Sequence, residues 1–184
     1  LHLLSRRQRQ MCIRDRDKQI LQLINGQINF EFFSSYLYLG FANYYAEADL
    51  DGFENWFRIQ AQEELDHAML LIQYLHNNDQ KVILEQIRKP DLKLTSHTQP
   101  LKIAYEHEKQ VTVRFNRIYE AAFKKKDFRT TQLLEWFIME QGEEEKAASD
   151  LLAKMNLFGN DSKGLYELNK EFAARVYAAP SLVL

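Results

Sequence analysis

Apolar side chains recur every three or four residues along most of the chain, which is the period of an α-helix. Gly (6) and Pro (3) are scarce among the 184 residues, as expected when long helices dominate. Each long helix would measure about 40 Å at roughly 1.5 Å per residue. The pattern predicts four long helices and a final short one, over 17–48, 53–78, 98–126, 128–157 and 162–175.

The connections between these helices predict how they pack. The breaks at 49–52 and near 127 are short, so each should join two antiparallel neighbours. The connection over 79–100 contains two prolines and is long enough to run from one end of a bundle to the other. We therefore predict an all-α, up-down-down-up four-helix bundle with one long crossover and a short fifth C-terminal helix. This domain should cover 17–175, with a flexible tail over 176–184.

Acidic residues interrupt the apolar face of every long helix. The apolar positions beside them offer no Lys or Arg, and ionised carboxylates in a dry bundle each cost several kcal/mol without a counter-charge. Two helices carry a lone acid, and the other two carry a pair of polar residues three positions apart. In chain order the interruptions are Glu31, Glu64 with His67, Glu108, and Gln141 with Glu144.

A metal pair between the helices would explain these interruptions. Carboxylates with one imidazole suit iron or manganese, and the spacing of Glu64 and His67 directs both side chains to one spot. Helical di-metal sites use a Glu from each of two helices and Glu-x-x-His from the other two. Here the second motif has Gln141 first and Glu144 last, so the site is lopsided. We predict a first metal at Glu31, Glu64, His67 and Gln141, and a weaker second metal at Glu64, Glu108 and Glu144.

A second layer of acids lies one position away from these faces, at the same height of the bundle. It consists of Glu63, Glu140 and Glu143. One interpretation is an ordinary solvated helix face. The other is a third metal position or an exit route for the metal.

Residues 1–16 differ from the rest. They hold five Arg and one Asp, resemble translated sequencing-adaptor sequence, and form a poor secretory signal. We expect a gene-model artefact or disordered leader, with a functional basic arm as the alternative. Because this segment contributes +4 to the net charge of −2, the remainder has −6, which does not favour nucleic acid. Apolar runs are too short for a membrane span, and the single cysteine, Cys12, favours a reducing, cytoplasmic location.

Five segments resemble the bacterial non-haem ferritins, in order and at matching spacing over 17–175. They are INFEFFSSYLY (28–38), AQEELDHAMLLIQYL (61–75), YEHEKQVT (105–112), LLEWFIMEQGEEEK (133–146) and GLYELNKE (164–171). The resemblance implies a ferritin-like fold, iron storage and detoxification, and self-assembly into a homo-oligomeric cage, a homo-24-mer. It also implies a ferroxidase that oxidises Fe²⁺ to Fe³⁺ with O₂ or H₂O₂ at a di-iron centre and deposits ferric oxide inside the cage.

The resemblance also implies roles for individual residues. Tyr38 and Trp136 fall where the family has aromatic residues beside the iron, and either could be a redox or supporting group. Haem is not expected, because Leu65 occupies the place of the haem-ligating Met of bacterioferritins. The implied iron ligands are Glu31, Glu64, His67 and Gln141 for the first iron, Glu64, Glu108 and Glu144 for the second, and Glu63, Glu140, Glu143 and Glu144 for the third.

Two other functions remain open at this level. A ferritin-like di-iron oxidase or peroxidase would have the same ligands but would not store iron, and a purely structural bundle could retain a degenerate site.

His107 adjoins Glu108 but lies about 100° around the helix. We therefore expect His107 to be a surface residue.

Overall fold

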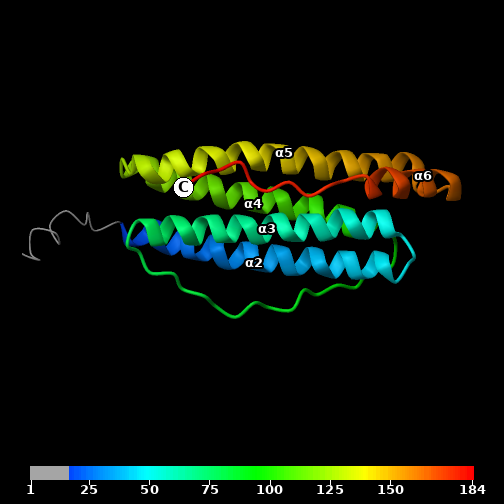
Figure 1. The fold of residues 1–184 in the computed structure, drawn as a ribbon, viewed down its shortest axis with the longest axis horizontal. Coiled ribbons are helices and arrows are strands. Elements are labelled where there is room, and N and C mark those ends of the chain that lie inside the picture. Colours follow the sequence, from blue (N-terminus) through cyan, green and yellow to red (C-terminus); the bar gives the residue numbers. More distant parts are fainter. Residues whose placement is uncertain (1–16) are drawn as a thin grey trace, which may run out of the picture.

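The computed structural model describes residues 17–184, which form a helical bundle (Figure 1). No strand occurs among these residues, and none of their helices is long and apolar enough to cross a membrane. The leader predicted over 1–16 lies outside the described residues. The helices are α2 (Lys18–Ala46), α3 (Asp51–Asn77), α4 (Thr98–Lys124), α5 (Phe128–Phe158) and the short α6 (Ser162–Ala173).

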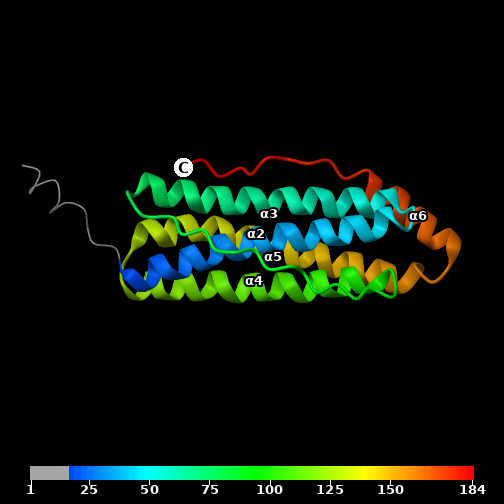
Figure 2. The same cartoon turned by 90° about the horizontal axis from the view of Figure 1, so that it is seen from below.

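The topology is the predicted up-down-down-up arrangement. Helices α2 and α3 form one antiparallel hairpin, α4 and α5 form another, and the connection between the hairpins runs the length of the bundle (Figures 1 and 2). Two asparagines of α2 hold this crossover, because Asn25 Oδ1 accepts from the backbone N–H of Ile83 at 2.6 Å and Asn29 Oδ1 from that of Glu85 at 2.7 Å. The crossover is therefore pinned to the first hairpin.

Aspartates begin three of the helices. Asp17 accepts from the Gln19 N–H at 2.8 Å, and Asp161 accepts from the Gly164 N–H at 2.8 Å. Asp127 does the same at α5. The first break lies slightly earlier than predicted, at 47–50. Its reversal is made at Asp49, which has the left-handed φ of 56° that Asp tolerates better than most residues.

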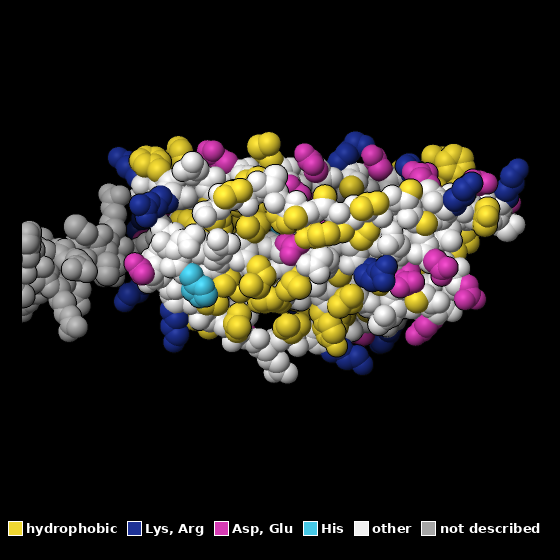
Figure 3. Space-filling view, in the orientation of Figure 1, with side chains coloured by type: hydrophobic (Ala, Val, Ile, Leu, Met, Phe, Trp, Pro, Cys, Tyr) yellow, Lys and Arg dark blue, Asp and Glu magenta, His cyan; other side chains and the backbone are white. Residues whose placement is uncertain are grey.

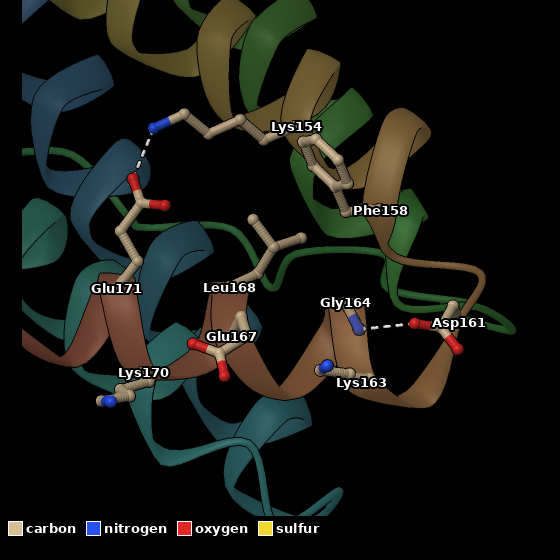
Figure 4. Close-up of a pocket in the computed structure, with 9 residues that line it drawn as sticks. All are labelled: Lys154, Phe158, Asp161, Lys163, Gly164, Glu167, Leu168, Lys170 and Glu171. Carbon is tan, nitrogen blue, oxygen red and sulfur yellow. Dashed lines mark hydrogen bonds and ion pairs between the residues drawn. The ribbon is translucent and has the colours of Figure 1, made fainter.

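Helix α3 takes its cap from another helix. Its own N-cap residue, Leu50, has no side-chain acceptor, and Asn169 of α6 accepts from the Gly52 and Phe53 N–H groups at 2.8 and 3.3 Å. A Cβ at Gly52 would lie 1.7 Å from the Asn169 carbonyl oxygen, so this approach requires glycine. A shallow groove between α5 and α6, crossed by a Lys154–Glu171 ion pair, contains none of the predicted ligands (Figure 4).

The apolar core is divided into two clusters. One contains Tyr45 and Phe53, and the other contains Ile20 and Phe115. Along every long helix, the predicted site residues lie between positions that belong to different clusters. The flanking pairs are Ile28 and Tyr38 around Glu31, Ala61 and Leu71 around Glu64, Ala104 and Val111 around Glu108, and Phe137 and Leu151 around Gln141. A polar layer therefore crosses the bundle at mid-height.

Candidate metal centre

Five predicted ligands come together in two groups. Ligand atoms of Glu31, Glu64 and His67 all lie within 4.8 Å of one another, and so do those of Glu64, Glu108 and Glu144. Glu64 belongs to both groups, as predicted for a bridging residue. The first group comes entirely from α2 and α3, whereas the second draws on α3, α4 and α5.

These side chains are removed from water, and several of their atoms have no hydrogen-bond partner. Glu31 and Glu64 are 0% exposed and His67 is 3% exposed. A buried acceptor without a partner is costly, and such atoms are rare in folded proteins. Carboxylate oxygens with one imidazole nitrogen suit iron or manganese, so the residues fit such a cation. Among residues 17–184 the buried atoms without a hydrogen-bond partner are Glu31 Oε2, Glu64 Oε2, His67 Nδ1 and Glu144 Oε2, of which Glu64 Oε2 and His67 Nδ1 lie 3.7 Å apart.

Burial, and secondly repulsion between the acids, raises the pKa of most of these carboxyl groups. Burial, with the charge of Glu64 beside it, raises the pKa of Glu31 well above its usual value, and the same causes act on Glu144. Burial also raises the pKa of Glu108 to about 8. At Glu64 burial acts in the same direction, but hydrogen bonding and the charge of His67 outweigh it and lower the pKa. Glu64 is therefore the carboxylate that ionises first, and a cation would replace protons on the others.

Glutamine amides hold one oxygen of the acids and leave the other unpaired. Gln27 Nε2 donates to Glu31 Oε1 at 2.7 Å, and Gln60 Nε2 donates to Oε1 of both Glu64 and Glu144 at 3.0 Å. The unpaired atoms of these acids are in each case Oε2. Each amide is oriented by an arginine that donates to its oxygen: Arg114 to Gln27 at 2.7 Å, and Arg175 to Gln60 at 3.1 Å. Sequence reasoning missed these amides, although each glutamine precedes its acid by four positions.

Glu108 is held differently, by partners on both oxygens. Tyr38 donates its hydroxyl to Oε1, and Gln141 Nε2 donates to Oε2 at 2.7 Å. The amide nitrogen of Gln141 thus faces the second group, and its role as a ligand of the first metal stays a prediction. Burial raises the pKa of Tyr38 well above its usual value, so Tyr38 is a neutral donor. Trp136 lies edge-on to His67, with 5.7 Å between ring centroids.

The expectation that His107 lies at the surface was wrong. It is 5% exposed, its Nε2 lies 2.7 Å from Ser34 Oγ, and its ring stacks on Phe30. His107 is buried because α2 covers this flank of α4, and the pattern within a single helix does not reveal such a contact. Burial lowers the pKa of His107 to about 4, so the imidazole is neutral near pH 7 and adds no charge beside Glu108.

The proposed third set is less closely assembled. Glu63 and Glu140 are half-buried and Glu143 is exposed. Within the part of the chain that the structure describes, none of these three belongs to a group with ligand atoms within 4.8 Å. Glu63 Oε2 instead lies 2.5 Å from a guanidinium nitrogen of Arg175. The third metal position stays a prediction.

The fold and the site define a class: helical bundles that hold carboxylates and an imidazole in two adjoining groups, each of which could hold a metal ion. Residues 21–158 match the family model described as "Ferritin-like domain". A bacterial non-heme ferritin of Campylobacter jejuni is 35% identical over 149 residues, which are 81% of this chain and 89% of that protein. A probable bacterial non-heme ferritin-like protein of Haemophilus influenzae is 32% identical, over 84% of this chain and 93% of its own length.

Solved structures agree. An open pore ferritin from Archaeoglobus fulgidus superposes with a TM-score of 0.85 at 38% identity, covering 88% of this chain and 98% of that one. The chain belongs to the ferritin family. The resemblance inferred from its five segments is thereby confirmed.

Proposed function

We propose that this chain is an iron-storing ferroxidase. Two Fe²⁺ ions enter the centre as substrates and each gives up one electron. O₂ takes the two electrons with two protons to give H₂O₂, and the ferric product collects as oxide inside a cage of identical chains. H₂O₂ in place of O₂ would take the same two electrons, with two protons, to give two molecules of water. One observation carries the proposal: two ligand groups share Glu64, and Glu31, Glu64 and Glu144 each keep one buried oxygen unpaired.

The two proposed iron positions have different ligands. Glu31 and His67 would hold the first iron with Glu64 as the bridge, and the imidazole should make this position the tighter one. Gln141 would complete it. Glu108 and Glu144 would hold the second iron, and the carboxylic acids would release protons as it binds. Oxygen ligands favour Fe³⁺ over Fe²⁺, so this set promotes oxidation, while the buried position limits access of water. Tyr38 would keep Glu108 oriented.

Cage assembly in the cytoplasm is part of the same proposal. The ferritins of known structure that this chain resembles support the assembly, and so does the surface of the molecule. Large hydrophobic side chains lie exposed on α2 and on the crossover, where a monomer gains nothing from them. They include Tyr36 and Leu39 of α2 and Ile83, Leu84 and Ile87 of the crossover.

The proposal is tested by adding Fe²⁺ in air to metal-free protein, both as the full chain and beginning at Asp17, while oxidation is followed optically. Two or three irons per chain oxidised quickly, then slow uptake far beyond that in a large soluble particle, would support a storage ferroxidase. A fast phase that ends at two irons with nothing retained would favour a non-storing oxidase or peroxidase. Absence of a fast phase would overturn the ferroxidase. Glu64→Gln should abolish the fast phase, and Glu135→Gln, at an exposed position of α5, is the matched control.

A further inference from the structure

The segment after α6 returns along the bundle instead of leaving it (Figures 1 and 2). It contacts α3 and α5, the two helices that carry the proposed third set of acids. Tyr177 donates its hydroxyl to Asp66 of α3 at 2.6 Å, and Ser181 Oγ accepts from Trp136 Nε1 of α5 at 3.0 Å. In Figure 3, hydrophobic side chains gather over the middle of the face along which this segment runs.

Arg175 is the residue of this segment that reaches the site. Its Nη2 atom lies 2.5 Å from Glu63 Oε2 and 3.1 Å from Gln60 Oε1, and its Nη1 donates to the Trp56 carbonyl at 3.2 Å. The guanidinium also lies 4.2 Å above the Trp56 ring. Gln60 in turn donates to Glu64 and Glu144. One fixed cation therefore neutralises an acid of the third set and orients the amide that serves the two ligand groups.

We propose that Arg175 is a tethered cation at the third metal position, so that docking of the C-terminal segment and metal binding at Glu63 exclude each other. Arg175 is then a specificity-determining residue: it sets whether the centre takes two metals or three. This inference rests on the proposed function for the identity of the metal, but not for the docking itself.

The segment is built to be displaced. It has no regular secondary structure, and most of its side chains are exposed, whereas Arg175, Pro180 and Leu182 are partly buried. Val176 is 82% exposed and Val183 is 92% exposed, whereas Leu182 packs against the core, so undocking exposes apolar surface mainly at Leu182. A divalent ion at Glu63 carries twice the charge of the guanidinium and can recruit Glu140 and Glu144 as well. If the docked form is favoured about tenfold, the apparent affinity of the third position falls about tenfold.

The chain also contains its own reporters of docking. Both of its tryptophans contact the segment, Trp56 beneath Arg175 and Trp136 at Ser181. Displacement of the segment should therefore change tryptophan fluorescence. This readout is independent of iron oxidation.

The experiment titrates the full chain with Zn²⁺, which is redox-inert, by calorimetry and tryptophan fluorescence. For Arg175→Gln we expect a third equivalent that binds about tenfold tighter than in the unaltered protein. The fluorescence change that accompanies the third equivalent should disappear. Arg175→Lys, which keeps the charge, should restore most of the weak binding. Arg58→Gln, an exposed arginine of α3, is the matched control.

The contrary outcomes are distinct. A third equivalent with the same affinity in Arg175→Gln and Arg58→Gln would overturn the proposal, as would binding of only two Zn²⁺ by both Arg175→Gln and the unaltered chain. If the unaltered chain and all of its variants failed to bind the first two equivalents of Zn²⁺, the proposed ferroxidase centre would instead be refuted. Glu63→Gln gives a second check, since in metal-free protein it should release the segment and shift the fluorescence as Arg175→Gln does. Unchanged tryptophan fluorescence in Glu63→Gln would also contradict the proposal.

Discussion

Gln141 Nε2 lies 2.7 Å from Glu108 Oε2 and so joins the middle of α5 to the middle of α4. A glutamate at position 141 would restore the first residue of the Glu-x-x-His motif, although position 144 would still be Glu, and it would place two carboxylates in contact. The amide avoids that repulsion in the metal-free protein. It also gives the second ligand group a neutral donor where it already has three acids.

Gln141→Glu should therefore make the protein depend on metal for stability. Loss of the donor and the added repulsion should lower the stability of metal-free protein by about 1–3 kcal/mol at pH 8. Zn²⁺ should raise the melting temperature of the variant more than that of the unaltered chain. Scanning calorimetry with and without Zn²⁺ measures both effects. Gln132→Glu, exposed on α5, is the control, and equal melting temperatures for the two variants would contradict the argument.

The stability of the metal-free protein should fall as the pH rises from about 5 to about 8. Burial raises the pKa of Glu108 to about 8, and the pKa values of Glu31 and Glu144 are raised as well. In this window the folded protein keeps protons that the unfolded chain has lost. Stability then decreases by about 1.4 kcal/mol per pH unit for each such proton. Urea unfolding in the presence of a chelator tests this, and Glu108→Gln should flatten the slope. A flat slope in the unaltered protein would show that these carboxyls titrate normally.

Tyr38→Phe should destabilise the protein without changing how many irons it oxidises quickly. The hydroxyl donates to Glu108, and removing it leaves a buried oxygen without its partner, at a cost of about 1–3 kcal/mol. Because no ligand is lost, the fast phase of Fe²⁺ oxidation should keep its stoichiometry. Chemical denaturation and the iron titration check the two statements. A changed stoichiometry would mean that Tyr38 takes part in binding the metal.

Gln27→Leu should weaken the first metal position. Its amide fixes Glu31 Oε1 at 2.7 Å and so sets the direction of Oε2. Loss of a hydrogen bond to a metal ligand typically lowers metal affinity by about 10–100-fold. Calorimetric titration with Zn²⁺ measures the effect, with Gln110→Leu on the exposed side of α4 as the control. Equal affinities in the two variants would assign Gln27 a packing role only.

The sequence was sufficient for the bundle and for most of the residues that the structure brings together at the candidate site, because both rest on local spacing. Helical period and connection length predict the topology, and a polar pair such as Glu64 and His67 is visible in one helix alone. The misses all depend on contacts between distant elements. His107 is buried by α2, Asn169 caps a different helix, and Arg175 reaches the acids only because the chain folds back. No periodicity within one helix carries that information.

The division of the ligands between the two hairpins has a consequence for the order of assembly. Glu31, Glu64 and His67 all lie on the α2–α3 hairpin, whose contacts are close in sequence and should form early. Glu108 and Glu144 arrive only after the chain has passed through the crossover. The first ligand group can therefore come together before the second hairpin docks, whereas the second group is created by closure of the whole bundle. A metal ion held by the second group would bind only the finished bundle, and its binding would therefore favour closure of the two hairpins.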